Sequence, residues 1–299
     1  MLKKQTLQVW WLAIRPKTLP AAAAPVVIGT AAAFLEGGFR WLPALAALIG
    51  ALCLQIGANL ANDVFDFKRG TDAGERLGPL RVTQAGLLSP GQVLVGMWVV
   101  FGIAAFMGLY LAFIAGWAVI WMGLACILAA LAYTGGPLPF GYYGLGDLVV
   151  FLFFGPLAVC GTYFVQAGQV SRLAAWSSIP VGLLIVAILV VNNLRDIESD
   201  RSAGKRTLAV RIGVPGTRRE YAACVLGAYL VTLGVALAGI SPPWVVLSEL
   251  SLPLAFRMIA MVNQQSGRPL NQALAGTGRL TLVFALLYSA GLVLAGIIS

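Results

Sequence analysis

The chain has 299 residues, of which 60% are apolar and only 10% are charged. A soluble globular domain carries roughly 25% charged residues, so this composition excludes an ordinary soluble protein and predicts an integral membrane protein. The net charge of +9 does not indicate nucleic-acid binding, because basic loops are what orient a membrane protein. Histidine is absent and the four cysteines lie in apolar segments without paired spacing, which argues against an imidazole or thiolate metal site.

The first 18 residues are basic and amphipathic, and we expect them to lie at the membrane interface. Apolar runs of about 20 residues, the length that crosses a bilayer as a helix, follow along the rest of the chain. The expected fold is all-α and polytopic, with residues 1–299 forming a single domain. Nine spans are predicted, at 19–35, 42–62, 92–114, 117–134, 148–166, 175–195, 220–240, 243–262 and 279–298.

The distribution of positive charge predicts the orientation. With the amino terminus inside, every Lys and Arg except Arg40 and Arg172 falls on the inner side. By the positive-inside rule this predicts a cell-membrane protein, in a bacterium an inner-membrane one, with a cytoplasmic amino terminus. Two inner loops, 63–91 and 196–219, are long and carry spaced apolar residues. Long loops are commonly functional, and we expect these two to form short helices that cap the bundle.

Two clusters of Asn and Asp follow apolar runs on this inner side. At helical spacing, each cluster would point to one face of its helix. The carboxyl end of a helix is the negative pole of its dipole, so several acids there require a compensating cation. Magnesium prefers oxygen ligands and often completes its shell with phosphates, so we expect Mg2+ and a diphosphate between the clusters. The clusters are Asn59, Asn62, Asp63 and Asp66, and Asn192, Asn193, Asp196 and Asp200.

A simpler interpretation pairs these acids with neighbouring basic residues in solvated loops. The repetition of the pattern on the same side of the membrane favours the cation site instead. A diphosphate beside an apolar bundle implies a lipid tail between the helices, and a metal ion would stabilise the departing diphosphate. The allylic carbon left behind would need a dry, aromatic-lined chamber. Basic residues available to neutralise the phosphates are Lys68, Arg81, Arg195, Arg201, Lys205 and Arg206.

At these clusters the chain resembles the UbiA-type intramembrane prenyltransferases, a family with nine helices and two Asp-rich motifs. The first motif, usually NDxxDxxxD, reads NDVFDFKRGTD here and departs from the pattern at its third acid, Asp72. The second, DxxxD, reads DIESD from Asp196 to Asp200. Within the family, four strings most resemble the branch that prenylates 1,4-dihydroxy-2-naphthoate. They are RPKTLP (15–20), GPLRVTQ (78–84), GYYGLGD (141–147) and NNLRDIESDRSAGKRTLAVRIG (192–213).

The resemblance implies transfer of a polyprenyl group from polyprenyl diphosphate to the naphthoate ring, in place of its carboxylate. Carbon dioxide and diphosphate would be lost, and the product would be demethylmenaquinol for menaquinone biosynthesis. The implied metal ligands are Asp63, Asp66, Asp196, Asp200, Asn62 and Asn193. The implied substrate contacts at the diphosphate are Asn59, Asn62, Lys68, Asp72, Arg81, Asn192, Asn193 and Lys205.

Three further sets of residues each have two possible roles. Arg15 and Lys17 would face the diphosphate or the acceptor's carboxylate, or they anchor the interface as snorkelling side chains. Asp147 would orient or deprotonate an acceptor hydroxyl, or it caps a helix. Tyr133, like Tyr142 and Tyr143, would line the acceptor pocket or join the interfacial aromatic belt.

The sequence also allows other functions. A sibling enzyme would use another aromatic acceptor, such as 4-hydroxybenzoate or homogentisate, or a phytyl donor as in phylloquinone synthesis. A membrane transporter is the alternative from another class, but transport sites tend to lie near the bilayer midplane rather than at helix ends. Prenyl length and oligomeric state are not predicted.

Overall fold

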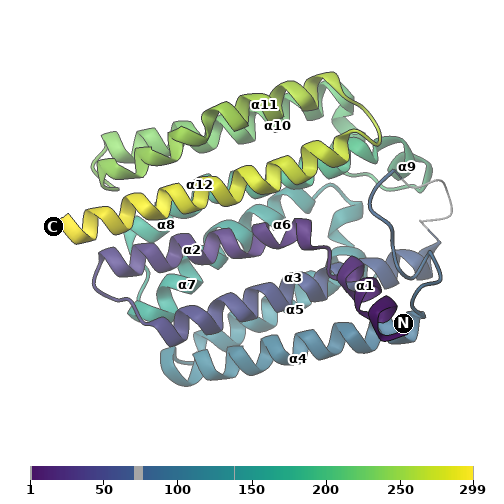
Figure 1. Cartoon of the computed structure of the whole chain (residues 1–299), viewed down its shortest axis with the longest axis horizontal. Coiled ribbons are helices and arrows are strands. Elements are labelled where there is room, and N and C mark those ends of the chain that lie inside the picture. The colour runs from purple at the N-terminus through teal and green to yellow at the C-terminus, as the bar shows by residue number, and fades with distance from the viewer. Residues whose placement is uncertain (1, 71–76, 138, 299) are drawn as a thin grey trace.

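The computed structural model describes residues 2–70, 77–137 and 139–298, and its regular elements there are all helical. The long helices lie side by side in one bundle (Figure 1). The α-helices are α1 (Leu2–Ile14), α2 (Leu19–Leu35), α3 (Trp41–Arg69), α4 (Pro90–Ala115), α5 (Ala118–Thr134), α6 (Gly146–Leu152), α7 (Ala158–Ala167), α8 (Arg172–Arg195), α9 (Ile197–Ser202), α10 (Leu208–Leu237), α11 (Leu252–Gln264) and α12 (Leu270–Ile298). Shorter elements are η1 (Pro16–Thr18), η2 (Phe140–Tyr142), η3 (Phe153–Leu157) and η4 (Pro243–Ser251).

Helix α8 is the centre of the bundle. It packs against α2, α6, α10 and α12, and it is the most buried of the apolar spans. Its buried residues include Val181, Leu184 and Ala187.

The structure confirms an all-helical, multi-pass membrane protein but differs in the number of long spans. Among the described residues, eight helical segments are long and apolar enough to cross a membrane, where the sequence predicts nine. The predicted span 117–134 is α5, an apolar helix of only 17 residues. Its 17 residues rise about 25 Å, which is shorter than the roughly 30 Å hydrocarbon core.

Two predicted spans are irregular because of proline. The predicted span 148–166 contains η3, a π-helical turn that includes Pro156, between α6 and α7. Proline lacks an N–H and clashes with the preceding turn, so the helix widens there. The predicted span 243–262 begins as the 3-10 helix η4, and the α-helical part α11 starts with Pro253 in its first turn, where the missing N–H costs nothing.

The prediction of capping helices is right for one inner loop and wrong for the described part of the other. In the loop 196–219, α9 forms a short helix that ends at Ser202. In the loop 63–91, α3 continues to Arg69, and residues 77–89 form turns without a helix. The turn is stabilised because the Asp63 carboxylate accepts the backbone N–H groups of Val82 and Thr83.

Buried hydroxyl pairs connect the helices inside the apolar core. Tyr221 on α10 bonds Thr277 on α12 at 2.8 Å, and Ser177 on α8 bonds Tyr288 on α12 at 2.9 Å. Such interhelical bonds contribute about 0.6 kcal/mol each in a membrane bundle. Helices α1 and α9 and the carboxyl end of α3 gather at one end of the bundle, the right-hand end in Figure 1.

Candidate active site

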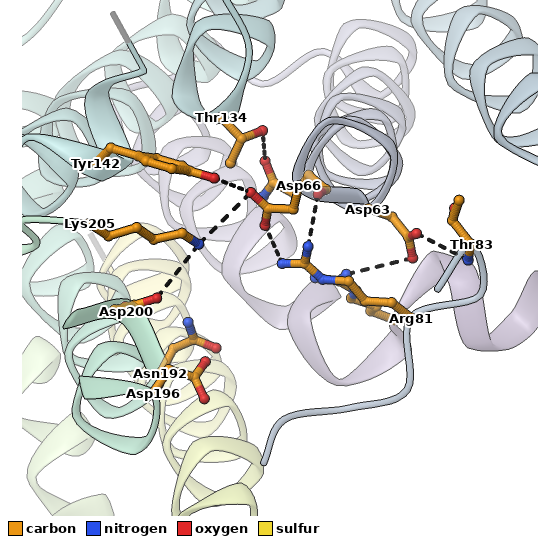
Figure 2. Close-up of polar contacts among 12 residues, drawn as sticks. Asp63, Asp66, Arg81, Thr83, Thr134, Tyr142, Asn192, Asp196, Asp200 and Lys205 are labelled. Carbon is orange, nitrogen blue, oxygen red and sulfur yellow. Dashed lines mark hydrogen bonds and ion pairs between the residues drawn. The ribbon is translucent and has the colours of Figure 1, made fainter. Parts of the chain in front are cut away.

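The two Asp-rich motifs, far apart in sequence, meet at this end of the bundle. Asp66 lies on the last turns of α3, and Asp200 lies on α9. The Lys205 Nζ atom lies 3.8 Å from Asp66 Oδ1 and 3.6 Å from Asp200 Oδ1 (Figure 2). The expected convergence of the motifs is therefore confirmed, and a single ammonium group bridges them.

Asp66 is the most heavily contacted acid of the site. The residue is 1% exposed, and its carboxylate forms an ion pair with Arg81 and accepts the Tyr142 hydroxyl at 2.6 Å. Arg81 also donates to the Asn62 carbonyl oxygen at 3.2 Å, which fixes the guanidinium over the end of α3. Asp66 therefore pairs with basic residues, as the simpler interpretation expects, but it does so in a buried site and not in a solvated loop.

Asp63 is a structural organiser of the loop that carries Arg81. Its two oxygens accept the N–H groups of Val82 and Thr83 at 3.1 and 3.2 Å, and Arg15 Nη2 lies 4.0 Å from Oδ2. Arg15 has φ 55°, a left-handed conformation that is uncommon for a residue with a side chain. Thr18 holds the Arg15 carbonyl oxygen through both its N–H and its hydroxyl, each at 2.9 Å. Such strained residues cluster at functional sites, and this one brings a cation to the first motif.

The asparagines of the first motif fasten neighbouring segments. Asn59 donates to the Ile14 carbonyl at 2.9 Å and to the Thr18 hydroxyl at 3.0 Å, so it holds the junction between α1 and α2. Asn62 accepts the Thr134 hydroxyl at 2.9 Å, which joins α3 to the end of α5. Both amides also line the large cavity described below.

The second motif does not form one continuous helix face, contrary to the prediction. Helix α8 ends at Arg195, and Asp196 has φ −97° and ψ 8° before α9 begins. Asn192 lines the cavity together with Ile188 and Leu189, whereas Asn193 is buried and is not among the lining residues. Adjacent helical residues point about 100° apart, so the two asparagines face different surroundings, and the expectation that Asn193 is a metal ligand stays a prediction.

Arg195 organises the second motif, a role that sequence reasoning missed. Its guanidinium is buried and donates to both oxygens of Asp196, at 2.8 and 2.5 Å. It also donates to Asn192 Oδ1 at 2.9 Å and to Asn271 Oδ1 at 2.8 Å. A side chain at Gly78 would meet Arg195, because a Cβ there would lie 2.7 Å from Nη2.

Asp200 is a buried carboxylate with incomplete compensation. The pKa of Asp200 is raised to about 6, mainly by burial; Lys205 opposes the shift, and the charges of Asp196 and Asp66 add to it. A carboxylate in this position lacks positive charge, which is the environment that a divalent cation would satisfy.

A long apolar cavity of about 410 Å³ begins at these polar residues. Its polar end includes Arg15, Asn62, Tyr133 and Asn192, and its lining continues along α3 as far as Ala47. The distance from Asn62 to Ala47 along the helix axis is about 22 Å, so the cavity runs through most of a bilayer's depth. Alanine, leucine, valine and glycine are the commonest lining residues, and the aromatic members among the described lining residues are Tyr133, Phe153 and Phe154.

The remaining candidates are dispersed. Lys17 and Lys68 are exposed, and Asp72 lies outside the described residues. Tyr133 lines the cavity, and its hydroxyl lies close to Gly146, since a Cβ built there would be 3.1 Å from it. Asp147 follows in the first turn of α6, with Oδ2 buried and without a hydrogen bond among the described residues.

The described acids and amides of the two motifs have the donor atoms that a divalent ion prefers, but they are not close enough together to hold one alone. The candidate ligands are carboxylate and amide oxygens, the donor set of magnesium, with no imidazole or thiolate beside them. Among the described residues, no group of three or more acids is close enough to hold a metal by itself. Phosphate oxygens would therefore have to complete the coordination shell, as is common for magnesium.

Comparison with known proteins places the chain in a family. The profile of the UbiA prenyltransferase family matches residues 22–284. The chain is 42% identical to the 1,4-dihydroxy-2-naphthoate octaprenyltransferase of Mycobacterium tuberculosis over 93% of this chain and 94% of the relative. It is 40% identical to the enzyme of that name from Escherichia coli, over 86% of each chain.

The fold has a solved counterpart as well. A UbiA homologue from Archaeoglobus fulgidus bound to GPP and Mg2+ superposes with a TM-score of 0.69, covering 95% of this chain and 99% of that one at 13% identity. At that identity the likeness concerns the fold alone, but the family profile and the close relatives span nearly all of the sequence. The chain therefore belongs to the UbiA prenyltransferase family.

Proposed function

We propose that this protein transfers a polyprenyl group from polyprenyl diphosphate to 1,4-dihydroxy-2-naphthoate, giving demethylmenaquinol for menaquinone biosynthesis. The allylic carbon–oxygen bond of the donor breaks and diphosphate leaves. A carbon–carbon bond forms at the ring carbon that bears the carboxylate. That carboxylate leaves as carbon dioxide and returns its bonding pair to the ring, so the aromatic system is restored.

One observation carries the proposal: a polar end at the two motifs continues into an apolar cavity about 22 Å deep. A polyprenyl diphosphate has the matching form, with a charged head and a long apolar tail. The relatives named above add the acceptor, since 1,4-dihydroxy-2-naphthoate appears in their names.

The residues around the head have distinct roles under this proposal. Arg81 and Lys205 bind the diphosphate, and Arg15 supports them from the end of the cavity. Magnesium, when bound, supplies positive charge that stabilises the departing diphosphate. Its proposed ligands come from Asp63, Asp66, Asp196, Asp200 and Asn62, and the geometry favours Asn192 over Asn193 as a further oxygen donor.

The remaining groups act on the acceptor and on water. The Ala- and Gly-rich lining excludes water from the allylic cation that forms as diphosphate leaves. Tyr133 borders the cavity beside the start of α6, where Asp147 lies, so this pair is positioned to orient an acceptor hydroxyl. Lys68 and Asp72 remain proposed diphosphate contacts on sequence grounds alone.

The topology follows from the same proposal. Helix α5 crosses the membrane as a ninth, short span, and residues 1–299 act as one prenyltransferase domain. The amino terminus and both motifs face the cytoplasm. Single cysteines placed at Lys68 and Arg172 in a cysteine-free background test this, because only Lys68→Cys would react with an impermeant thiol reagent from the cytoplasmic side.

The activity is tested with purified protein in lipid, one labelled prenyl diphosphate and a panel of aromatic acids. We expect a prenylated, decarboxylated product from 1,4-dihydroxy-2-naphthoate, identified by mass. A product from 4-hydroxybenzoate or homogentisate alone, or a need for a phytyl donor, would assign the protein to a sibling pathway. Transport of a solute without product chemistry would reject the enzyme assignment.

A further inference from the structure

A second, smaller pocket lies beside the diphosphate end and shares no lining residue with the long cavity. Its volume is about 310 Å³, at the lower end of the range for small-molecule sites. Two arginines, two tyrosines and two prolines form most of its wall: Arg69, Arg206, Tyr142, Tyr143, Pro137 and Pro139. The walls come from α3, from the segment between α5 and α6, and from the segment between α9 and α10.

Tyr142 forms the boundary between this pocket and the acid cluster. Its ring is faced by Arg69 at 5.2 Å and by Lys205 at 4.6 Å, measured to the ring centroid. Its hydroxyl donates to Asp66 at 2.6 Å, as Figure 2 shows. One side chain is thus both a wall of the pocket and a hydrogen-bond partner of the first motif.

The positive charge of the pocket comes from Arg69 and Arg206. The segment 134–146, which supplies its tyrosines and prolines, contains no Lys or Arg. Arg69 donates to the Gly136 carbonyl, and Arg211 donates to the Tyr143 carbonyl at 2.8 Å. The Arg206 N–H donates to the Tyr142 carbonyl at 2.8 Å, so the backbone of Arg206 is fixed against this segment. Two of the described lining residues are arginines, and none of the described lining residues is acidic.

These walls fit one class of ligand best, a planar aromatic carboxylate. Guanidinium groups bind carboxylates with paired, charge-assisted hydrogen bonds. Tyrosine and proline rings offer flat apolar faces for an aromatic ring. An inorganic phosphate or diphosphate would use the charges but leave these faces without contact.

We propose that this pocket is the entry site at which the aromatic acid acceptor first binds, with its carboxylate at Arg206 and Arg69 and its ring against Tyr142 and Tyr143. This inference rests on the proposed function, which requires an acidic aromatic acceptor. The acceptor is charged and arrives from water, whereas the prenyl tail arrives from the bilayer. The two routes meet at Tyr142, where the pocket adjoins Asp66.

The principal test is Arg206→Gln, because this variant keeps the backbone contact to Tyr142. We expect the KM for 1,4-dihydroxy-2-naphthoate to rise about threefold to tenfold, the loss typical of one charge-assisted contact near the surface. The turnover number and the KM for prenyl diphosphate should stay within about twofold of wild type, because the proposal gives Arg206 no contact with the donor. A change of about twofold corresponds to less free energy than one surface ion pair typically contributes. Arg69→Gln should act in the same direction.

A pair of competitive inhibitors makes the test specific for the carboxylate. Wild type should bind 1-hydroxy-2-naphthoate more tightly than 1-naphthol, and Arg206→Gln should lose most of that difference. The matched control is Arg201→Gln on the neighbouring helix α9. The sequence suggested Arg201 as a phosphate contact, but its side chain is exposed and pairs only with Glu198 among the described residues. The control should leave both inhibition constants unchanged.

Two results would overturn the proposal. One is an unchanged acceptor KM together with an unchanged preference for the carboxylate in both Arg206→Gln and Arg69→Gln. The other is a rise in the inhibition constant of diphosphate or in the donor KM instead, which would assign the pocket to phosphate. If wild type prenylates another aromatic acid, the proposed function fails, but the same variants measured with that acid still decide the role of the pocket.

Discussion

The two Asp-rich motifs hold their acids in different ways. The first motif lies on the continuous helix α3, where Asp63 accepts two backbone N–H groups and Asp66 is held by Arg81 and Tyr142. The second lies across a helix break, where Arg195 holds Asp196 and, among the described residues, Lys205 alone forms an ion pair with Asp200. The first motif is thus assembled by the fold, whereas Asp200 of the second still lacks positive charge. We infer that substrate binding completes the second motif more than the first.

The largest effect is expected at Asp66. Asp66→Asn keeps the shape but removes the charge that compensates Arg81 and Lys205, so both the ion pairs and the proposed metal site are lost. Turnover should fall about 100-fold or more, as when a principal transition-state electrostatic contact is removed. Initial rates at saturating substrates measure this, with Glu198→Gln on α9 as the control acid. Full activity in Asp66→Asn would remove the first motif from the mechanism.

Arg195→Lys is expected to come next. Lysine keeps the charge but lacks the planar fork that contacts Asp196, Asn192 and Asn271 together. Asn271 in turn donates to the Leu77 carbonyl at 2.7 Å, so the variant should also loosen the loop that carries Arg81. We expect a donor KM about tenfold higher, the size of one buried charged contact. Arg201→Lys is the matched control, and equal kinetics in the two variants would contradict this role.

The pH dependence should distinguish Asp200 from the acids of the first motif. Its folded pKa of about 6 lies above the ordinary 3.8, so its ionisation in the folded protein costs stability as pH rises from about 4 to 6. Without magnesium, wild type should lose thermal stability over that window, and Asp200→Asn should lose less. With magnesium and donor present, the ionised form is the binding form, so donor affinity should weaken below about pH 6. Melting curves of wild type and variant that run parallel across this range would exclude the assignment.

The smallest effect separates the two neighbouring asparagines of α8. Asn192→Ala removes a residue that lines the cavity and accepts from Arg195, and it should raise the donor KM about threefold to tenfold, as one hydrogen bond to a charged group does. Asn193→Ala should leave the donor KM within about twofold of wild type. A change of about twofold corresponds to much less free energy than one hydrogen bond to a charged group. Donor titrations of the two variants check this, and a larger effect at Asn193 than at Asn192 would favour Asn193 as the ligand.

Much of the fold was predictable because apolar length alone identifies membrane helices. The irregular parts were not, since the 17-residue α5 falls just below the spanning length and the π-helical turn at Pro156 depends on packing. The acids were predictable from their spacing and from the quoted strings. The roles of Tyr142 and Arg195 were not, because they arise from contacts with Asp66 and Asn271, each 76 residues away. For Tyr142, its place in the string GYYGLGD was a signal; Asn271 carried none.

The central claim is that the two motifs form one diphosphate site, and a double-mutant cycle tests it most directly. Binding of a prenyl diphosphate in the presence of magnesium is measured for wild type, Asp66→Asn, Asp200→Asn and the double variant. A shared site predicts strong coupling between the two acids. The double variant should bind the donor only slightly more weakly than the weaker-binding single variant, with an interaction energy of about 1 kcal/mol or more. Losses that add within about 0.5 kcal/mol would show that the two acids act independently and would contradict a single shared site.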